Sequence, residues 1–405
     1  MRLIAPFLRS RSSADLNSSE NLRRLSLSYF FYFGLLGVIV PYTSVFLDGR
    51  GLSSYEIGSL LGIVTLTRVL GPNLWANLAD RTGKTVEIVR FGCLMATSCF
   101  ISVFWLDGFW PLTFAFSSMM LFWTAVLPQL EVICVQASQH SKGGYGAIRL
   151  WGSVGFIVFT VAMGLSLDLF GSEAVLVSIL LCLICLYIST LYVTQAPIKA
   201  NEQGPKASLN EWSRVFKAPF LVFLLAASLL QVSFASYYNF FALYAQSLGF
   251  SGATTGLLLA VAVTAEIIIF LFAKPMIKRL GVKALLVASF FITAVRWLIL
   301  AYFAQIFWLV LLSQLLHAFS FGVSHAAAVY FIHQYFSDGF LSRAQALYSS
   351  IAFGLGGAFG SYIVGITWQQ GEGAVTSFVF SAACVGVAGV LMLMCPNYEP
   401  SEKQK

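Results

Sequence analysis

The stretch Ala-Asn-Leu-Ala-Asp-Arg-Thr-Gly-Lys, residues 76–84, is a short charged connection between two long apolar segments, residues 54–76 and 86–106. Each segment is long enough to cross about 30 Å of hydrocarbon as a helix. Glycine at position 83 permits the positive φ angle that a tight reversal needs. A similar order of basic residue, spacer, glycine and lysine recurs at residues 278–283. The sequence therefore predicts two membrane-spanning helical hairpins that echo each other.

Apolar segments of spanning length recur along the whole chain. The chain is 58% hydrophobic and 10% charged, with a mean hydropathy of +0.82, whereas soluble proteins are about 25% charged. Membrane β-barrels show short alternating segments instead. We therefore predict an all-α membrane protein with twelve transmembrane helices. The predicted segments are 25–47, 54–76, 86–106, 110–137, 145–167, 174–193, 219–247, 252–273, 282–303, 306–334, 344–367 and 375–395.

Basic residues predict the orientation in the membrane, because Lys and Arg are retained on the cytoplasmic side of short loops. Five arginines precede the first segment, and others lie in the alternate loops that follow it and in the tail. The loops of the other side carry one basic residue, Arg50. Both termini are expected in the cytoplasm. The net charge of +7 records this bias, so no nucleic-acid partner is expected.

A polar linker divides the chain into two halves. It covers residues 195–218 and contains Pro197, Gly204 and Pro205. Transporters built from repeats bind their solute near the midplane, between such halves. The predicted organisation is a cytoplasmic tail (1–24), a six-helix bundle (25–194), a cytoplasmic linker (195–218), a second six-helix bundle (219–395) and a cytoplasmic tail (396–405).

The loop at residues 76–84 resembles the signature of the major facilitator superfamily, with alanine where glycine is usual in the first position. The resemblance implies two pseudo-symmetric bundles that rock around a central site. It also implies a gating role for Asp80, Arg81, Gly83 and Lys84. We expect a monomer in the bacterial inner membrane, in contact with the lipid bilayer.

Five ionisable residues interrupt the predicted helices. An ionised group at mid-bilayer depth costs at least a few kcal/mol, so it is kept mainly where it faces a protein interior or a water-filled cavity. This pattern indicates a protein that handles a polar solute. The residues are Glu131, Arg149, Glu266, Arg296 and His317.

Glu131 and Arg149 lie eighteen residues apart on consecutive predicted helices. A carboxylate facing a guanidinium in a partly dry cavity is stable while paired, yet it can exchange its partner for substrate. The segment 145–156 resembles the matching helix of lactose permease and its oligosaccharide:proton symporter relatives, which implies that Arg149 binds substrate. Phe156 replaces the family's tryptophan, and Trp151 offers another aromatic wall or a packed or lipid-facing ring. Arg149 could instead reach the headgroups.

In the second half, Arg296 and His317 match residues that this family uses for proton coupling. Glu266 lies about one turn from the position of the family's proton-carrying acid, so the resemblance implies a related role. His325 follows His317 by eight residues, about 80° around an α-helix, and could join them. A static ion pair and packed histidines are the alternatives. Arg68 is either an anion-binding group or the partner of an acid on another helix.

The region from 25 to 395 looks closest to the 3-phenylpropionic acid transporter branch. Arginines at 68, 149 and 296 suit a carboxylate, and nearby aromatic rings suit an aromatic solute. We predict a proton-coupled importer of an aromatic carboxylate, with no cofactor other than the proton and no metal. A sugar or nucleoside symporter, a drug:proton exporter and a non-transporting sensor are the alternatives; an enzyme is not expected. The expected aromatic residues are Trp151, Phe156, Tyr237 and Tyr238.

Overall fold

The computed structural model describes residues 13–138, 144–194 and 209–396, which form helices joined by short connections. Twelve helices in this part are long and apolar enough to cross a membrane, so the predicted all-α fold with twelve spans is confirmed. Residues 1–12, 139–143, 195–208 and 397–405 lie outside the described residues, whereas residues 13–24 of the predicted tail form the start of the first helix. The side chains of Arg68 and Asp80 lie outside them as well, so the structure does not test those two predictions.

Each half of the chain supplies six spans, some of them built from two to four consecutive helical pieces. The first half consists of α1 (Ser13–Gly49), α2 (Ser54–Thr82), α3 (Thr85–Ile101) with η1 (Ser102–Trp105), α4 (Phe109–Trp123) with α5 (Val126–Ser138), α6 (Gly144–Phe170) and α7 (Glu173–Leu191). The second half consists of the short α8 (Leu209–Val215), α9 (Ala218–Ser247), α10 (Gly252–Leu280), α11 (Val282–Tyr302), α12 (Phe307–Leu315) with η2 (Ala318–Val323) and α13 (Ser324–Tyr335), α14 (Leu341–Tyr348) with η3 (Ser349–Gly356), α15 (Gly357–Trp368) with η4 (Gln369–Gly371), and α16 (Ala374–Met394).

The boundaries of α2 follow from its sequence. Its first turn carries a capping box, in which Ser53 Oγ accepts from the Glu56 N–H and the Glu56 carboxylate accepts from the Ser53 N–H at 2.8 Å. The helix ends at Gly83, whose φ of 66° is the left-handed conformation expected from the sequence. The matching helix α10 ends at Gly281, which also has a positive φ of 79°. The two echoed loops therefore reverse the chain at equivalent glycines.

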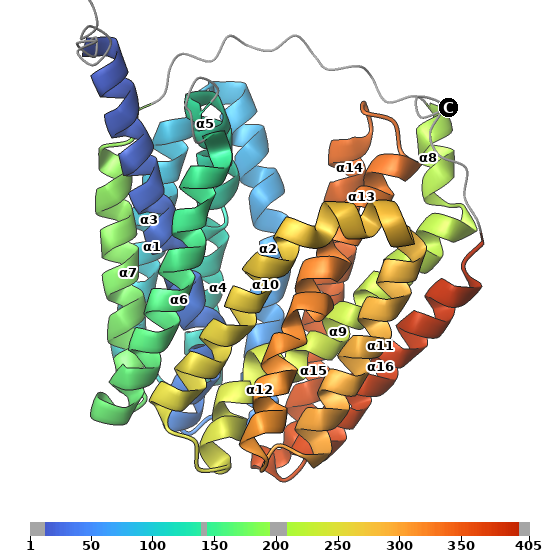
Figure 1. Ribbon diagram of the computed structural model, residues 1–405. Helices are drawn as coiled ribbons and strands as arrows, with labels where there is room; N and C mark the ends of the chain where they lie inside the picture. Colours follow the sequence, from blue (N-terminus) through green and yellow to red (C-terminus); the bar gives the residue numbers. More distant parts are fainter. Residues whose placement is uncertain (1–12, 139–143, 195–208, 397–405) are drawn as a thin grey trace, which may run out of the picture.

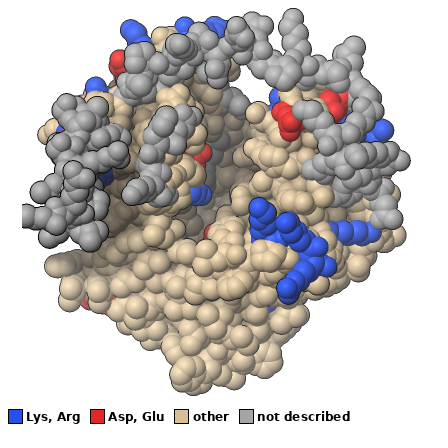
Figure 2. All heavy atoms as spheres, turned by 45° about the horizontal axis from the view of Figure 1, so that its top comes forward, with Lys and Arg blue, Asp and Glu red and all other residues tan. Residues whose placement is uncertain are grey.

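The two halves stand apart at one end of the molecule and meet at the other (Figure 1). The halves meet where α6 runs along α10, where α2 runs along α15 and where α1 contacts α9. We call this the closed end; it holds the α1–α2, α6–α7, α9–α10 and α15–α16 connections. The open end carries the beginning of α1 and the short helix α8. Viewed from the open end, a hollow runs between the halves and shows acidic and basic atoms on its wall (Figure 2).

Glycines set how closely helices approach within the first half. A Cβ atom on Gly155 of α6 would lie 2.1 Å from the carbonyl oxygen of Phe30 on α1, and one on Gly152 would lie 2.6 Å from the Phe33 ring. The two helices therefore pack backbone against backbone, as small residues permit in membranes. At the closed end of this half, Arg50 joins three connections through Glu173 at 2.6 Å and Asp107 at 2.7 Å.

Gly155→Ala should destabilise the first half, because the added methyl group has no space between α6 and the α1 backbone. Overpacking of this kind costs about 1–3 kcal/mol, so the thermal unfolding midpoint of the purified protein in detergent should fall by several degrees. Gly146→Ala is the matched control, since nothing lies within 4 Å of its Cβ position. Equal midpoints for both variants would contradict the packing described above.

Candidate functional site

The first half contributes a loosely held ion pair to the hollow. Arg149 Nη1 lies 3.4 Å from Glu131 Oε1, and the Tyr145 hydroxyl donates to the same oxygen at 3.2 Å. The two side chains are 50% and 42% exposed. This is the only hydrogen bond of the Arg149 guanidinium within the described residues, and its face lies 5.5 Å from the centre of the Phe33 ring. The predicted pair is formed. Most of the N–H donors of the Arg149 guanidinium remain available to hydrogen-bond a solute.

The face of α6 that carries Arg149 also carries Phe156 but not Trp151. At 100° per residue, Phe156 lies about 20° from Arg149 around the helix, whereas Trp151 lies about 200° away. Trp151 is 51% exposed, and its ring makes an edge contact with Phe30, with centroids 6.4 Å apart. Phe156 therefore lies on the same face of the helix as Arg149, two turns along, whereas Trp151 lies on the other side.

The second half holds a dry chain of polar groups centred on Arg296, which is fully buried. Its Nε donates to the Ser313 carbonyl at 2.8 Å, and its Nη1 lies 3.0 Å from His317 Nδ1. A guanidinium has only donors, so His317 Nδ1 acts as the acceptor and the ring proton is assigned to Nε2. That nitrogen lies 3.5 Å from Glu266 Oε2. Arg296, His317 and Glu266 are thus linked in this order, with the carboxylate at the end nearest the hollow.

The two predicted tyrosines both pack against this chain of polar groups, but they differ in burial. The Tyr237 ring is buried, stacks under the Arg296 guanidinium at 4.2 Å, and its hydroxyl donates to Gln314 Oε1 at 2.5 Å. Tyr238 is half-buried and meets the His317 ring edge-on, with centroids 6.2 Å apart. A cation over an aromatic face in a desolvated site gains about 2 kcal/mol. Tyr237 therefore holds the cation, and Tyr238 is the ring that a solute can reach.

A π-helical segment, η2, aligns the two histidines of this span. The rings of His317, Phe321 and His325 stack in a column, with centroids 6.0 Å and 5.5 Å apart and interplanar angles of 20° and 13°. A π turn takes roughly one residue more than an α turn, so each residue rotates by less than 100°, and the offset of about 80° between two α-helical residues eight apart becomes smaller. Gly322 lets this segment approach α10, because a Cβ there would lie 2.6 Å from Ile269. The α-helical geometry assumed from the sequence separated the two histidines; the π segment brings them into one column.

His325 lies between the charged groups of the two halves. The charges of Glu266 and Arg149 both act on its ring. Its Nδ1 atom is buried and has no hydrogen-bond partner among the described residues. Phe353 packs against the ring edge-on at 6.1 Å. His325 is thus a group of the second half that the charges of both halves reach.

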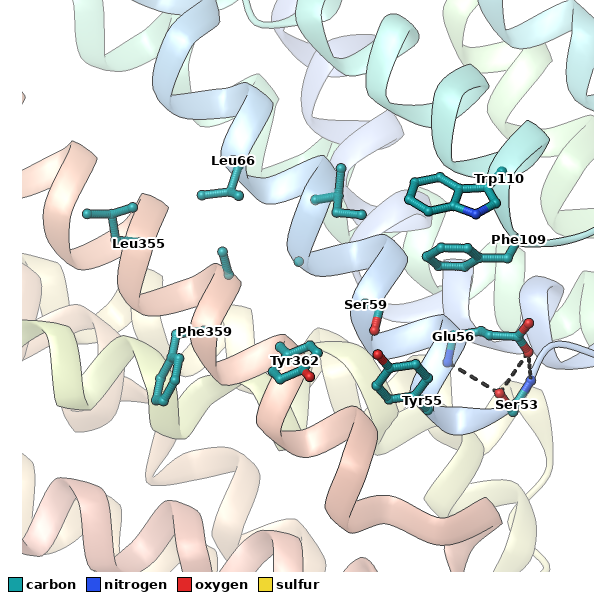
Figure 3. A pocket seen from close by; sticks show the side chains of 13 residues that line it. Ser53, Tyr55, Glu56, Ser59, Leu66, Phe109, Trp110, Leu355, Phe359 and Tyr362 are labelled. Atoms are coloured by element: carbon teal, nitrogen blue, oxygen red, sulfur yellow. Dashed lines mark hydrogen bonds between the residues drawn. The ribbon is translucent and has the colours of Figure 1, made fainter.

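Other predicted residues lie away from this cluster. Arg81 and Lys84 are exposed on the loop that Gly83 reverses. A separate groove of about 890 Å³ lies near the closed end between α2, α4 and α15, where Tyr55 and Tyr362 face each other (Figure 3). The one charged residue that lines this groove is Glu56, which caps α2, and the groove includes none of Glu131, Arg149, Glu266, Arg296 and His317. The charged hollow is therefore the candidate functional site.

Comparison with known proteins identifies the family. The model of the MFS_1 like family matches residues 22–380. The chain belongs to the MFS_1 like family. Members of this family are transporters, so the protein is a multi-pass secondary transporter of the major facilitator type that takes a small-molecule substrate, and not an enzyme. The resemblance inferred from residues 76–84 is confirmed.

Individual relatives differ in the solutes that their names state. The protein is 30% identical to the "Probable 3-phenylpropionic acid transporter" of Escherichia coli (strain K12), over 86% of its own chain and 92% of the relative. It is 28% identical to the "Maltose permease" of Geobacillus stearothermophilus, over 91% and 93%. The crystal structure of a mutant of nucleoside transporter NupG matches with a TM-score of 0.84 at 15% identity, covering 92% of this chain and 99% of that chain. This last likeness shows the fold alone.

Proposed function

We propose that this transporter is a proton-coupled importer of small aromatic carboxylates, which works by alternating access in the bacterial inner membrane. One observation carries the proposal: a half-exposed guanidinium, Arg149, makes a single 3.4 Å contact with Glu131 in the first half, while the second half holds the largely buried carboxylate of Glu266 beside His317. The name of the relative from Escherichia coli supports the substrate class.

Substrate binding exchanges one ionic partner for another. A solute carboxylate can take the bidentate geometry that Glu131 does not use on Arg149, while the Tyr145 hydroxyl keeps Glu131 hydrogen-bonded. The ring of the solute then lies against Phe156 and Phe33 on the same side. An aromatic carboxylate satisfies both the cation and the rings, whereas a neutral solute leaves the cation with its weak contact.

Proton coupling is assigned to Glu266. Its side chain is 18% exposed, so it is reachable from the hollow but largely removed from water. As an anion it accepts from His317, which Arg296 in turn holds; once protonated, it no longer needs this support. The carrier can therefore alternate between a state with a charged Glu266 and a neutral state. No other cofactor is proposed.

The direction of opening follows from the orientation of the chain. If both termini are cytoplasmic, as the basic loops predict, then the hollow opens to the cytoplasm and the closed end faces outward. The structure is then the inward-facing state, from which solute and proton leave together. The opposite state requires the seams at the closed end to part.

A neutral sugar is the second candidate substrate, because the maltose permease matches over 91% of this chain at 28% identity. Glu131 and Arg149 could hydrogen-bond the hydroxyl groups of a sugar without parting. The two substrates therefore differ in whether the ion pair must exchange partners.

Aromatic carboxylates should displace a bound probe better than neutral solutes do. In a competition panel with radiolabelled 3-phenylpropionate on purified protein, unlabelled phenylpropionate and cinnamate should compete, while 3-phenylpropionamide, the matched neutral analogue, should not. The loss of one charge-assisted hydrogen bond predicts at least about tenfold weaker binding for the amide. No saturable binding of 3-phenylpropionate, or stronger displacement of the probe by maltose or a nucleoside than by the carboxylates, would move the substrate to the alternative class.

Glu131→Gln and Arg149→Ala should each abolish binding of the same probe, because Arg149 supplies the cation that the solute carboxylate needs and Glu131 holds that guanidinium in position. Arg149→Lys should also fail, since lysine lacks the planar fork. Trp151→Ala is the control on the opposite side of α6 and should bind normally. Thermal unfolding checks that every variant is folded; normal binding by both Glu131→Gln and Arg149→Ala would remove the pair from the site.

Glu266→Gln should mimic the permanently protonated carrier. In proteoliposomes, exchange of substrate across the membrane should survive, while uphill accumulation driven by a pH gradient should be lost. Full pH-driven accumulation in this variant would place coupling elsewhere, with Glu131 and His325 the next candidates, or would indicate a uniporter.

A further inference from the structure

Two seams close the molecule at one end, and each is a direct contact between helix backbones. On the seam of α6 and α10, a Cβ on Gly164 would lie 2.1 Å from the Gly252 carbonyl oxygen. On the seam of α2 and α15, a Cβ on Gly58 would lie 2.5 Å from the Gly365 Cα atom. Such contacts allow close approach but contain few polar bonds of their own. The polar interactions that stabilise the seams must therefore lie beside them.

Asp168 fastens the first seam, one helical turn beyond Gly164. Its Oδ1 accepts from the Gly252 N–H at 2.6 Å, and its Oδ2 accepts from the Ala253 N–H at 2.8 Å. These are the first backbone N–H groups of α10, which have no partner within their own helix. A carboxylate at a helix N-terminus also gains from the helix dipole. A side chain of the first half thus caps a helix of the second half.

Gln370 fastens the second seam, five residues beyond Gly365. Its Oε1 accepts from the N–H of Ser54, the first residue of α2, at 2.6 Å and also from the Ser54 hydroxyl; its own N–H donates to Ser54 Oγ at 2.9 Å. Gln369 and Gln370 both have left-handed backbones, with φ of 48° and 55°. For residues other than glycine this conformation is unfavourable. The hydrogen bonds with Ser54 are therefore made by a turn whose backbone conformation is unfavourable without them.

The two fastenings are equivalent under the internal repeat of the fold. Span 5 of the first half ends in Asp168 and caps the start of span 8, while span 11 of the second half ends in Gln370 and caps the start of span 2. Spans 5 and 11, like spans 2 and 8, hold equivalent positions in the two halves. We propose that Asp168 and Gln370 are paired latches that hold the closed end shut and must both release before the hollow can open on that side.

This inference rests on the alternating access of the proposed function, and it adds residues that set its equilibrium. Both latch side chains are exposed, so water can take over their hydrogen bonds when the halves part. Such hydrogen bonds stabilise the closed end without adding a high energy barrier to its opening. Asp168 should be the stronger latch, because its two bonds are charge-assisted. Neither residue touches Arg149 or Glu266.

Hydrogen–deuterium exchange of the purified protein, without substrate or pH gradient, tests the latches. Asp168→Ala should raise exchange at the closed end in peptides covering 50–58, 248–256 and 366–374. It should also slow exchange at the open end, in peptides covering 126–138 and 341–348, because parting of one end brings the other together. The shift in equilibrium should be about tenfold. Gln370→Ala should act in the same direction and less strongly.

Matched variants separate a latch from local fraying. Gln369→Ala keeps a left-handed neighbour but removes no bond across the seam, and Asp107→Asn changes a carboxylate at the same end that pairs within the first half. Both should leave the open end unchanged, and Asp168→Asn should fall between wild type and Asp168→Ala. Faster exchange confined to 248–256, or equal effects of Gln369→Ala and Gln370→Ala, would overturn the proposal. Because no solute is used, this result is independent of the substrate tests.

Discussion

The cost of keeping an ionised or unpaired polar group away from water at membrane depth is the constraint on which this structure depends. Each half meets it differently. The first half leaves Glu131 and Arg149 half-exposed in the hollow, where water and solute share the work of solvation. The second half buries Arg296 completely and surrounds it with the Ser313 carbonyl, a histidine nitrogen and two aromatic faces. One side of the hollow is therefore adaptable and the other is rigid.

This asymmetry separates two tasks that a coupled carrier must perform. A solute must be bound and released, which suits a pair that exchanges partners without large cost. A proton must be held or lost at one defined place, which suits a carboxylate whose neighbours are fixed. Glu266 has this setting because Arg296 orients His317 and His317 presents Nε2 to it. His325 stands between the two sides and senses the charges of both.

Much of the fold could be predicted from the sequence, because hydrophobic length and glycine positions act locally. The twelve spans and the reversal at Gly83 depend on nothing beyond neighbouring residues. The pairing of Glu131 with Arg149 was also predictable, since a buried charge needs a partner. The column of His317, Phe321 and His325 was not, because a π turn is set by packing against α10 and not by the local pattern. The place of Trp151 was not predictable either, because an aromatic residue that faces the hollow and one that faces lipid look the same in the sequence. Asp168 and Gln370 lie outside the apolar cores of the spans, where sequence alone gives no reason to connect them.

The π-helical segment η2 has a mechanical consequence. A π turn holds one residue more than an α turn, so it can travel along a helix when hydrogen bonds change partners one at a time. Each such step turns the residues it passes relative to the rest of the helix, while both ends of the helix stay in place. In this span the wide turn sits between His317 and His325. If the π turn moved by a few residues, it would rotate one imidazole about the helix axis relative to the other. The tilt of the bundle would not need to change. The second half therefore contains an axis of rotation that is separate from the rocking of the two halves.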